Sequence, residues 1–112
     1  MDDVLKKIRQ FRDERDWMQF HDPKNLATSI CIEAAELLEE FQWVDSKASD
    51  KHARENREAI ADEMADVAMY LFELADNLGI DLRKAMLAKL EKNAAKYPVK
   101  KARGVATKYT KL

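Results

Sequence analysis

The chain has 112 residues, enough for one domain with a single core of modest size. Its composition, with 46% hydrophobic and 37% charged residues, excludes a disordered chain. Its net charge is −1, no apolar run approaches the roughly 18 residues of a membrane-spanning helix, and its first residues lack the apolar core of a signal peptide. Cys31 is the single cysteine, so no internal disulfide is possible, which favours a cytoplasmic protein.

Proline and apolar periodicity define the first two predicted helices. Apolar residues recur at helical spacing from Val4 to about Trp17. Asp22 followed by Pro23 is a helix start, with the aspartate as N-cap and the proline at the first helical position. The second helix should then continue to about Trp43.

A polar segment, residues 44–50, connects the second predicted helix to a third. Ser49 or Asp50 could cap this third helix, which should reach Leu78 and end at Gly79. Its apolar side covers more than half of its circumference. Because four helices of this length offer too little material to cover so wide a face, we expect the core to be completed by a homodimer or homotetramer.

A fourth helix is predicted after Asp81 and should stop before Pro98. The residues after Pro98 are basic and show no regular period. With no strand of any length, the predicted fold class is all-α, a four-helix bundle. Residues 1–112 should form a single domain whose basic C-terminal tail occupies about 98–112.

Two carboxylate pairs at i, i+3 spacing border the apolar sides of the second and third predicted helices. Glu33 and Glu36 form the first pair, and Glu63 and Asp66 form the second. If the two helices pack antiparallel, the four carboxylates converge, and such a cluster is destabilising without a counter-charge. Converging oxygen ligands without histidine or thiolate suit Mg²⁺, which usually also binds a substrate phosphate.

Other interpretations of these acids are open. Either pair alone is typical of a solvated helix face, so only their combination indicates a site. A di-iron bundle would need Glu-x-x-His, but His21 and His52 follow Met18 and Ser49 by three residues, which excludes that pattern.

The charges are unevenly spread along the chain. Residues 33–76 contain 13 acids and 4 bases, whereas residues 83–112 contain 10 bases and one acid. Such asymmetry indicates either a tail that binds nucleic acid or a basic arm that grips a small polyanion beside an acidic metal site. Composition alone does not choose between them.

The acid pairs and their flanks resemble a known family. Glu33-x-x-Glu36, followed after 26 residues by Glu63-x-x-Asp66, resembles the signature of the all-α nucleoside triphosphate pyrophosphohydrolases, the MazG-like group. The flanking segments are similar to the dCTP pyrophosphatase branch of that group, from about Phe11 to the C-terminus. They are ERDWMQFHDPKNL (14–26), EEFQW (39–43), DEMADVAMYL (62–71), KLEKNAAKYP (89–98) and GVATKYTKL (104–112).

The resemblance implies an enzyme that uses Mg²⁺ to hydrolyse a deoxynucleoside triphosphate, dCTP or a modified dCTP, to the monophosphate and pyrophosphate. Such an enzyme cleanses the nucleotide pool. By position, Glu33, Glu36, Glu63 and Asp66 match the family's catalytic metal ligands. Metal binding lowers the pKa of a bound water, and one of these four carboxylates or Glu40 could take its proton.

The resemblance also implies a set of substrate-binding residues. Trp17, His21 and Trp43 match positions that line the base pocket, where a base could stack on an indole. Each has a structural alternative, since aromatic residues at helix ends usually belong to the core and a histidine at a helix entry often bonds to the backbone. Asn93, Lys96 and Tyr97 match positions at which the family's C-terminal residues grip the phosphates. Apart from the resemblance, Asn25 and Tyr70 lie along the acid strips of their helices and could meet the sugar or a phosphate.

Two alternative functions are retained. The first is a MazG-like pyrophosphohydrolase with a broader or different base preference. The second is a non-enzymatic helical interaction module whose acids are solvated and whose basic tail binds nucleic acid. The resemblance favours an enzyme that acts on a nucleoside triphosphate and has no nucleic-acid polymer as its partner.

Overall fold

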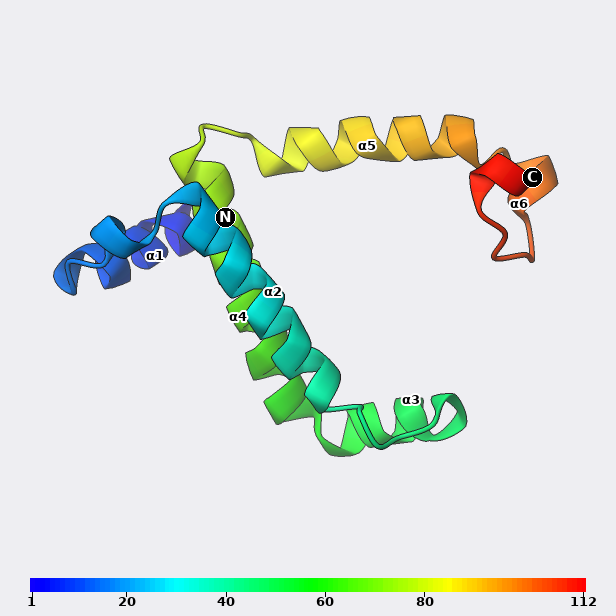
Figure 1. Ribbon diagram of the computed structural model, residues 1–112, viewed down its shortest axis with the longest axis horizontal. Helices are drawn as coiled ribbons and strands as arrows, with labels where there is room; N and C mark the ends of the chain where they lie inside the picture. The colour runs from blue at the N-terminus through cyan, green and yellow to red at the C-terminus, as the bar shows by residue number, and fades with distance from the viewer. The chain divides into compact units, whose positions relative to one another are not determined.

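The computed structural model describes residues 1–112 and consists of helices and turns without a strand, as Figure 1 shows. The predicted all-α fold class is confirmed. The chain divides into two compact units, Met1–Gly79 and Ile80–Leu112, which are described separately. The first unit contains α1 (Asp2–Glu14), η1 (Met18–Phe20), α2 (Pro23–Glu39), α3 (Ser46–Glu55) and α4 (Arg57–Asn77), and the second contains α5 (Leu82–Lys96), α6 (Val99–Ala102) and η2 (Tyr109–Lys111).

The first predicted helix forms but ends earlier than expected. Helix α1 stops at Glu14 because the backbone of Asp16 enters the left-handed region with φ of 55°. Aspartate tolerates this conformation better than most residues, which makes it a natural helix breaker. Trp17 therefore lies in the turn between α1 and the short 3₁₀ helix η1 rather than on a helix.

The predicted start of α2 is confirmed. The Asp22 carboxylate accepts a hydrogen bond from the backbone N–H of Asn25 at 2.8 Å, and Pro23 occupies the first turn. The end differs from the prediction, because α2 stops at Glu39 and the chain continues as turns to Trp43. Trp43 consequently lies outside the helix.

The predicted third helix is in fact two helices, and α6 forms after Pro98, so the chain has six α-helices instead of four. They meet at Asn56, whose side-chain Nδ2 donates to the carbonyl of His52 at 2.9 Å and terminates α3. The expected cap at Ser49 or Asp50 is also wrong. Asp45 caps α3 by accepting from the backbone N–H of Ala48 at 2.9 Å, which places the cap four residues before Ser49 and five before Asp50.

Helices α2 and α4 pack antiparallel along most of their length, and α1 packs on the C-terminal part of α4 (Figure 1). The core between them is small. Only three apolar side chains are buried: Leu26, Ile60 and Ala75. Arg9 donates from Nε to the Asp76 carboxylate at 2.8 Å and helps to hold α1 against α4.

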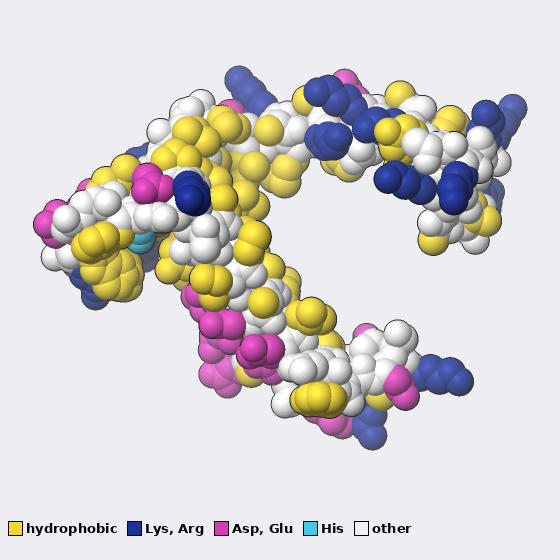
Figure 2. Space-filling view, viewed as in Figure 1, with side chains coloured by type: hydrophobic (Ala, Val, Ile, Leu, Met, Phe, Trp, Pro, Cys, Tyr) yellow, Lys and Arg dark blue, Asp and Glu magenta, His cyan; other side chains and the backbone are white.

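Many large apolar side chains of the first unit are exposed, and Figure 2 shows them over the α2–α4 pair. Leu38 of α2 is 66% exposed, and Met64 of α4 is 56% exposed. The completion of the core by further copies of the chain stays a prediction. None of the helices combines the length and the apolar character needed to span a bilayer.

The second unit begins with the predicted fourth helix, and its bounds are confirmed. Gly79, with φ of 68°, follows α4, and Asp81 caps α5 by accepting from the backbone N–H of Lys84 at 3.1 Å. The segment after Pro98 is more ordered than expected, since it forms α6 and η2. The prediction of a single domain over residues 1–112 with a basic tail stays a prediction.

Candidate active site

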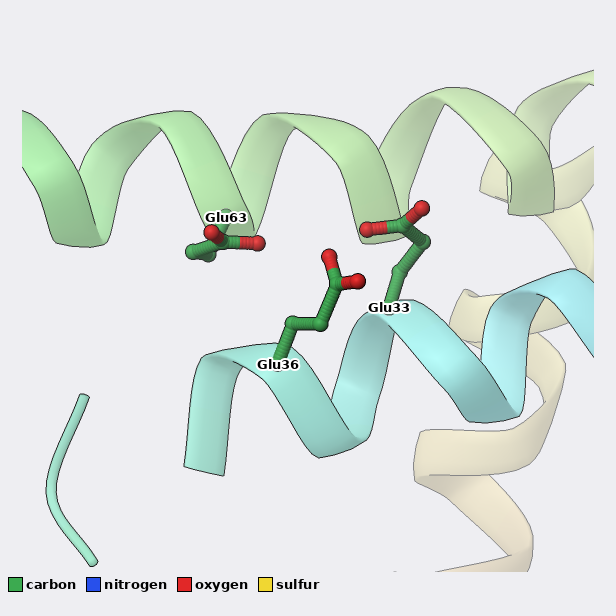
Figure 3. Close-up of side chains that lie close together, drawn as sticks. All are labelled: Glu33, Glu36 and Glu63. Carbon is green, nitrogen blue, oxygen red and sulfur yellow. The ribbon is translucent and has the colours of Figure 1, made fainter. Parts of the chain in front are cut away.

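Three of the four predicted metal-ligand carboxylates converge between α2 and α4. Glu33, Glu36 and Glu63 each offer an oxygen atom, and these atoms lie within 4.8 Å of one another. Figure 3 shows the two α2 side chains rising toward Glu63 on the facing helix. The i, i+3 spacing places Glu33 and Glu36 on one side of α2, and the antiparallel packing brings that side to α4.

The charges of this cluster repel one another. The pKa of Glu33 is raised to about 7, first because its protonated carboxyl can donate a hydrogen bond to Glu36, and then because it is partly desolvated and near other carboxylates. The pKa of Glu63 is also raised, chiefly by desolvation and then by the charge of Glu36. The cluster is therefore short of positive charge.

Two oxygen atoms of the cluster have no partner in the chain. The Oε2 atoms of Glu33 and Glu63 are buried and accept no hydrogen bond. Buried oxygen atoms that accept no hydrogen bond are costly. Clustered carboxylate oxygens are the ligands that hard divalent cations prefer. The residues present therefore fit a divalent cation.

Asp66, the fourth predicted ligand, lies one helical turn beyond Glu63 on α4. It is outside the group of oxygens within 4.8 Å, but its charge contributes to the raised pKa values of both Glu33 and Glu63. Asp66 also lines a cavity of the first unit. It thus connects the carboxylate cluster to that cavity.

A cavity of about 530 Å³ lies between α1, the turn that follows it and α4. Trp17, His21 and Tyr70, three predicted substrate-binding residues, line it. Their rings are neighbours, with the centroids of Trp17 and His21 6.3 Å apart and those of His21 and Tyr70 6.2 Å apart. Burial and then the nearby carboxylates raise the pKa of the Tyr70 phenol above an ordinary value that already keeps it protonated at neutral pH, so the phenol can donate a hydrogen bond.

His21 is held by Glu73, a residue that is not part of the predicted site. The Nδ1 atom of His21 lies 3.0 Å from Oε1 and 2.8 Å from Oε2 of Glu73, whose carboxylate is almost completely buried. The sequence signal that could have identified Glu73 is its position on the helix. Glu73 lies three residues after Tyr70 and continues the strip that begins with Glu63 and Asp66.

The structure gives Asn25 a role in holding the turn. Its backbone N–H donates to Asp22, and its side-chain Nδ2 donates to the carbonyl of Phe20 at 3.1 Å. These bonds order the entry to α2, next to His21. Asn25 does not line the cavity, and its predicted contact with substrate stays a prediction.

Trp43 does not share the cavity of Trp17 within one chain. It is 90% exposed and lines a separate, open hollow beside α3, together with Lys51, His52 and Glu55. A base pocket flanked by both tryptophans is therefore not formed by a single copy of the first unit.

Three predicted phosphate-binding residues lie at the end of α5 in the second unit: Asn93, Lys96 and Tyr97. The ring of Tyr97 packs edge-on against that of Tyr109 at 5.9 Å, and Nζ of Lys96 lies 4.9 Å from the centroid of the Tyr109 ring. Lysine and arginine side chains are prominent over this unit in Figure 2. The role of these residues toward a substrate stays a prediction.

Comparisons with known proteins agree with the geometry. Residues 28–112 match the MazG-like family, and the chain belongs to this family. The dCTP pyrophosphatase 1 of Bos taurus is 40% identical over 114 residues, which cover 100% of this chain and 68% of the relative. The dCTP pyrophosphatase 1 of Homo sapiens is 38% identical and is covered over 67% of its length.

A solved structure is also similar. The crystal structure of a pyrophosphatase from Archaeoglobus fulgidus superposes with a TM-score of 0.84 and 44% identity, covering 88% of this chain and 92% of that one. The predicted family and the predicted enzyme class, a nucleoside triphosphate pyrophosphohydrolase, are confirmed by these relatives.

Proposed function

We propose that this chain hydrolyses dCTP, or a modified dCTP, to the nucleoside monophosphate and pyrophosphate in a reaction that requires Mg²⁺. The observation that carries the metal requirement is the pair of buried, unpartnered carboxylate oxygens on Glu33 and Glu63. The names of the relatives, which are 38 to 40% identical, support the substrate.

Glu33, Glu36 and Glu63, with Asp66 beside them, would hold the cation. Bound Mg²⁺ would supply charge neutralisation for the triphosphate and a lowered pKa for a bound water. The chain's own task is to hold three converging carboxylates, with Asp66 one turn away, on two helices and to accept the proton that the attacking water loses. Glu40 is a further candidate acceptor, because its charge reaches Glu63.

The cavity beside Asp66 would take the base. Trp17 is 40% exposed and offers its indole for stacking, while His21 and Tyr70 offer polar edges. Because Trp43 lies outside this cavity, a base flanked by both tryptophans requires two copies of the chain. We therefore propose a homodimer or homotetramer whose active sites lie near subunit boundaries, supported by the exposed apolar face of α2 and α4.

The remaining predicted contacts complete the proposal. Asn93, Lys96 and Tyr97 would grip the phosphates, and Asn25 would meet the sugar or a phosphate. The two units would function as one domain with a basic tail. The chain would act in the cytoplasm on free nucleotides rather than on a nucleic-acid polymer.

The experiment that tests this function is an assay of pyrophosphate release over all dNTPs and NTPs, with Mg²⁺ and with a chelator. We expect release from dCTP with Mg²⁺ and none with the chelator. A similar rate for several bases would favour the broader MazG-like specificity. Failure to release pyrophosphate from any nucleotide would leave the non-enzymatic interaction module as the better description.

A further inference from the structure

Glu73 is the only buried charged residue of the chain, with 3% of its surface exposed. It lies on α4, and its carboxylate faces the Nδ1 atom of His21 at 2.8 and 3.0 Å. Arg12 of α1 compensates part of its charge, since Nη1 of Arg12 lies 3.8 Å from Oε1 of Glu73 and donates to Asn77 at 3.1 Å. The carboxylate is thus fixed from two sides.

This contact determines which nitrogen of His21 carries a proton. An ionised carboxylate only accepts hydrogen bonds, so beside an ionised Glu73 the Nδ1 atom carries the proton. In the neutral ring, Nε2 is then an acceptor. Nε2 of His21 makes no hydrogen bond within the chain, and the ring lies beside Trp17 and Tyr70 at the wall of the cavity.

We propose that Glu73 is a positioning residue that sets the base preference of this enzyme. By holding His21 in the Nδ1–H tautomer, it leaves Nε2 to accept a hydrogen bond from the 4-amino group of cytosine. Uracil and thymine carry an oxygen at this position, and two acceptors facing each other repel. The inference rests on the proposed function, because it assumes that the base occupies the cavity beside Asp66.

The chemistry of Glu73 explains why a carboxylate is used. A glutamine at this position could either accept from Nδ1–H through its oxygen or donate to Nδ1 through its nitrogen. Both tautomers of His21 would then be available. The tautomer with Nε2–H would donate a hydrogen bond to the 4-oxygen of uracil or thymine and so permit these bases to bind. Glutamine has nearly the size of glutamate, so the cavity itself is preserved.

The test compares Glu73→Gln with the wild type in kcat/KM for dCTP and dUTP at about pH 8, where an unperturbed imidazole is neutral. We expect the ratio of the two values to fall about five- to 150-fold, the usual effect of leaving a buried polar group unpaired. Asp76→Asn is the matched control. It also removes a carboxylate that joins α4 to α1, through Arg9, but it does not touch His21, and the ratio should be unchanged.

Nitrogen-15 NMR of the His21 ring gives a second measurement that needs no Glu73 variant. At about pH 8, the wild type should show a protonated Nδ1 and an unprotonated Nε2. Because His52 is the only other histidine, a His52→Gln variant assigns the signals. A protonated Nε2 in the wild type would overturn the proposal.

The outcomes separate this inference from the function on which it rests. A wild-type enzyme without preference for dCTP over dUTP would overturn the proposed substrate and the role of Glu73 together. A wild type that prefers dCTP, with the same ratio in Glu73→Gln, would overturn the role of Glu73 alone.

Discussion

Glu33 on α2 and Glu63 on α4 each contribute an oxygen atom to one group of carboxylates within 4.8 Å, and each keeps a buried Oε2 atom without a hydrogen-bond partner. The neighbouring carboxylate charges raise the pKa of both Glu33 and Glu63. The two unpartnered atoms are therefore costly to the fold, and a bound cation would relieve that cost. This relationship leads to the first two predictions.

The substitution Glu63→Gln should lower the activity by orders of magnitude. The side chain keeps its size, but the cluster loses one charge and one ligand oxygen for the cation. In a chelator, the variant should be as stable as the wild type or more stable, because repulsion is relieved. Glu58→Gln, which removes an exposed acid from the first turn of the same helix, is the control. A fully active Glu63→Gln enzyme would contradict the assigned site.

The stability of the metal-free protein should fall as the pH rises through the range in which Glu33 loses its proton. The pKa of Glu33 in the folded chain, about 7, is higher than its ordinary value of 4.5. Stability due to the protonated carboxyl is therefore present below about pH 4.5 and is lost as the pH rises toward 7.

The measurement is denaturant unfolding of the wild type and Glu33→Gln in a chelator at several pH values. Because the glutamine does not titrate, the variant should gain stability relative to the wild type across this range. Added Mg²⁺ should restore the wild type and have less effect on the variant. A stability difference that does not change with pH would contradict the prediction.

Truncation of Trp17 should impair binding more than chemistry. Its indole borders the cavity, packs edge-on against Phe11 at 5.7 Å between centroids, and is 40% exposed. Trp17→Ala should raise KM for dCTP roughly five- to 150-fold, which corresponds to about 1 to 3 kcal/mol of lost stacking. The effect on kcat should be smaller. Trp17→Phe keeps an aromatic ring, so its KM for dCTP should lie between those of the wild type and Trp17→Ala.

Thermal unfolding of the same Trp17→Ala sample separates the two roles of this residue. A core tryptophan would cost about 3 to 5 kcal/mol of stability on truncation. A large loss of stability with an unchanged KM would return Trp17 to the core and leave the choice of base unexplained.

The chain should associate in solution. Leu38 and Met64 are more than half exposed in a single copy, and apolar surface of this kind is usually covered by a partner. Light scattering at micromolar concentration should give a mass well above the 13.0 kDa of one chain. A value equal to one chain would contradict the proposed homodimer or homotetramer.

If Trp43 serves the site of a second copy, two defective variants should complement each other. In a mixed oligomer of Glu63→Gln and Trp43→Ala, one site combines an intact Glu63 from one copy with an intact Trp43 from the other. Co-expression should therefore recover dCTP hydrolysis with the KM of the wild type, in a fraction of the sites. If no such sites appear in isolated mixed oligomers, Trp43 acts within its own chain or not at all.

Much of the local structure could be predicted from the sequence, because its causes lie within a few residues. The caps at Asp22 and Asp81 need only the neighbouring backbone N–H groups, and both are present. The i, i+3 spacing of Glu33 and Glu36 is sufficient to place them on one side of a helix. Asn56 shows where this reasoning fails, since a side-chain bond to a carbonyl ended a helix that periodicity alone would have continued.

Only the tertiary structure decided which residues meet across the chain. It pairs His21 with Glu73 and, within one chain, separates Trp17 from Trp43, which the sequence predicts to line one pocket. Periodicity places a residue on a helix face but does not say which residue of another element it contacts, because that depends on the turn at Asp16 and on the packing of α1 against α4. The spacing of the acids therefore determined the kind of site, whereas the packing determined which groups surround the cavity beside it.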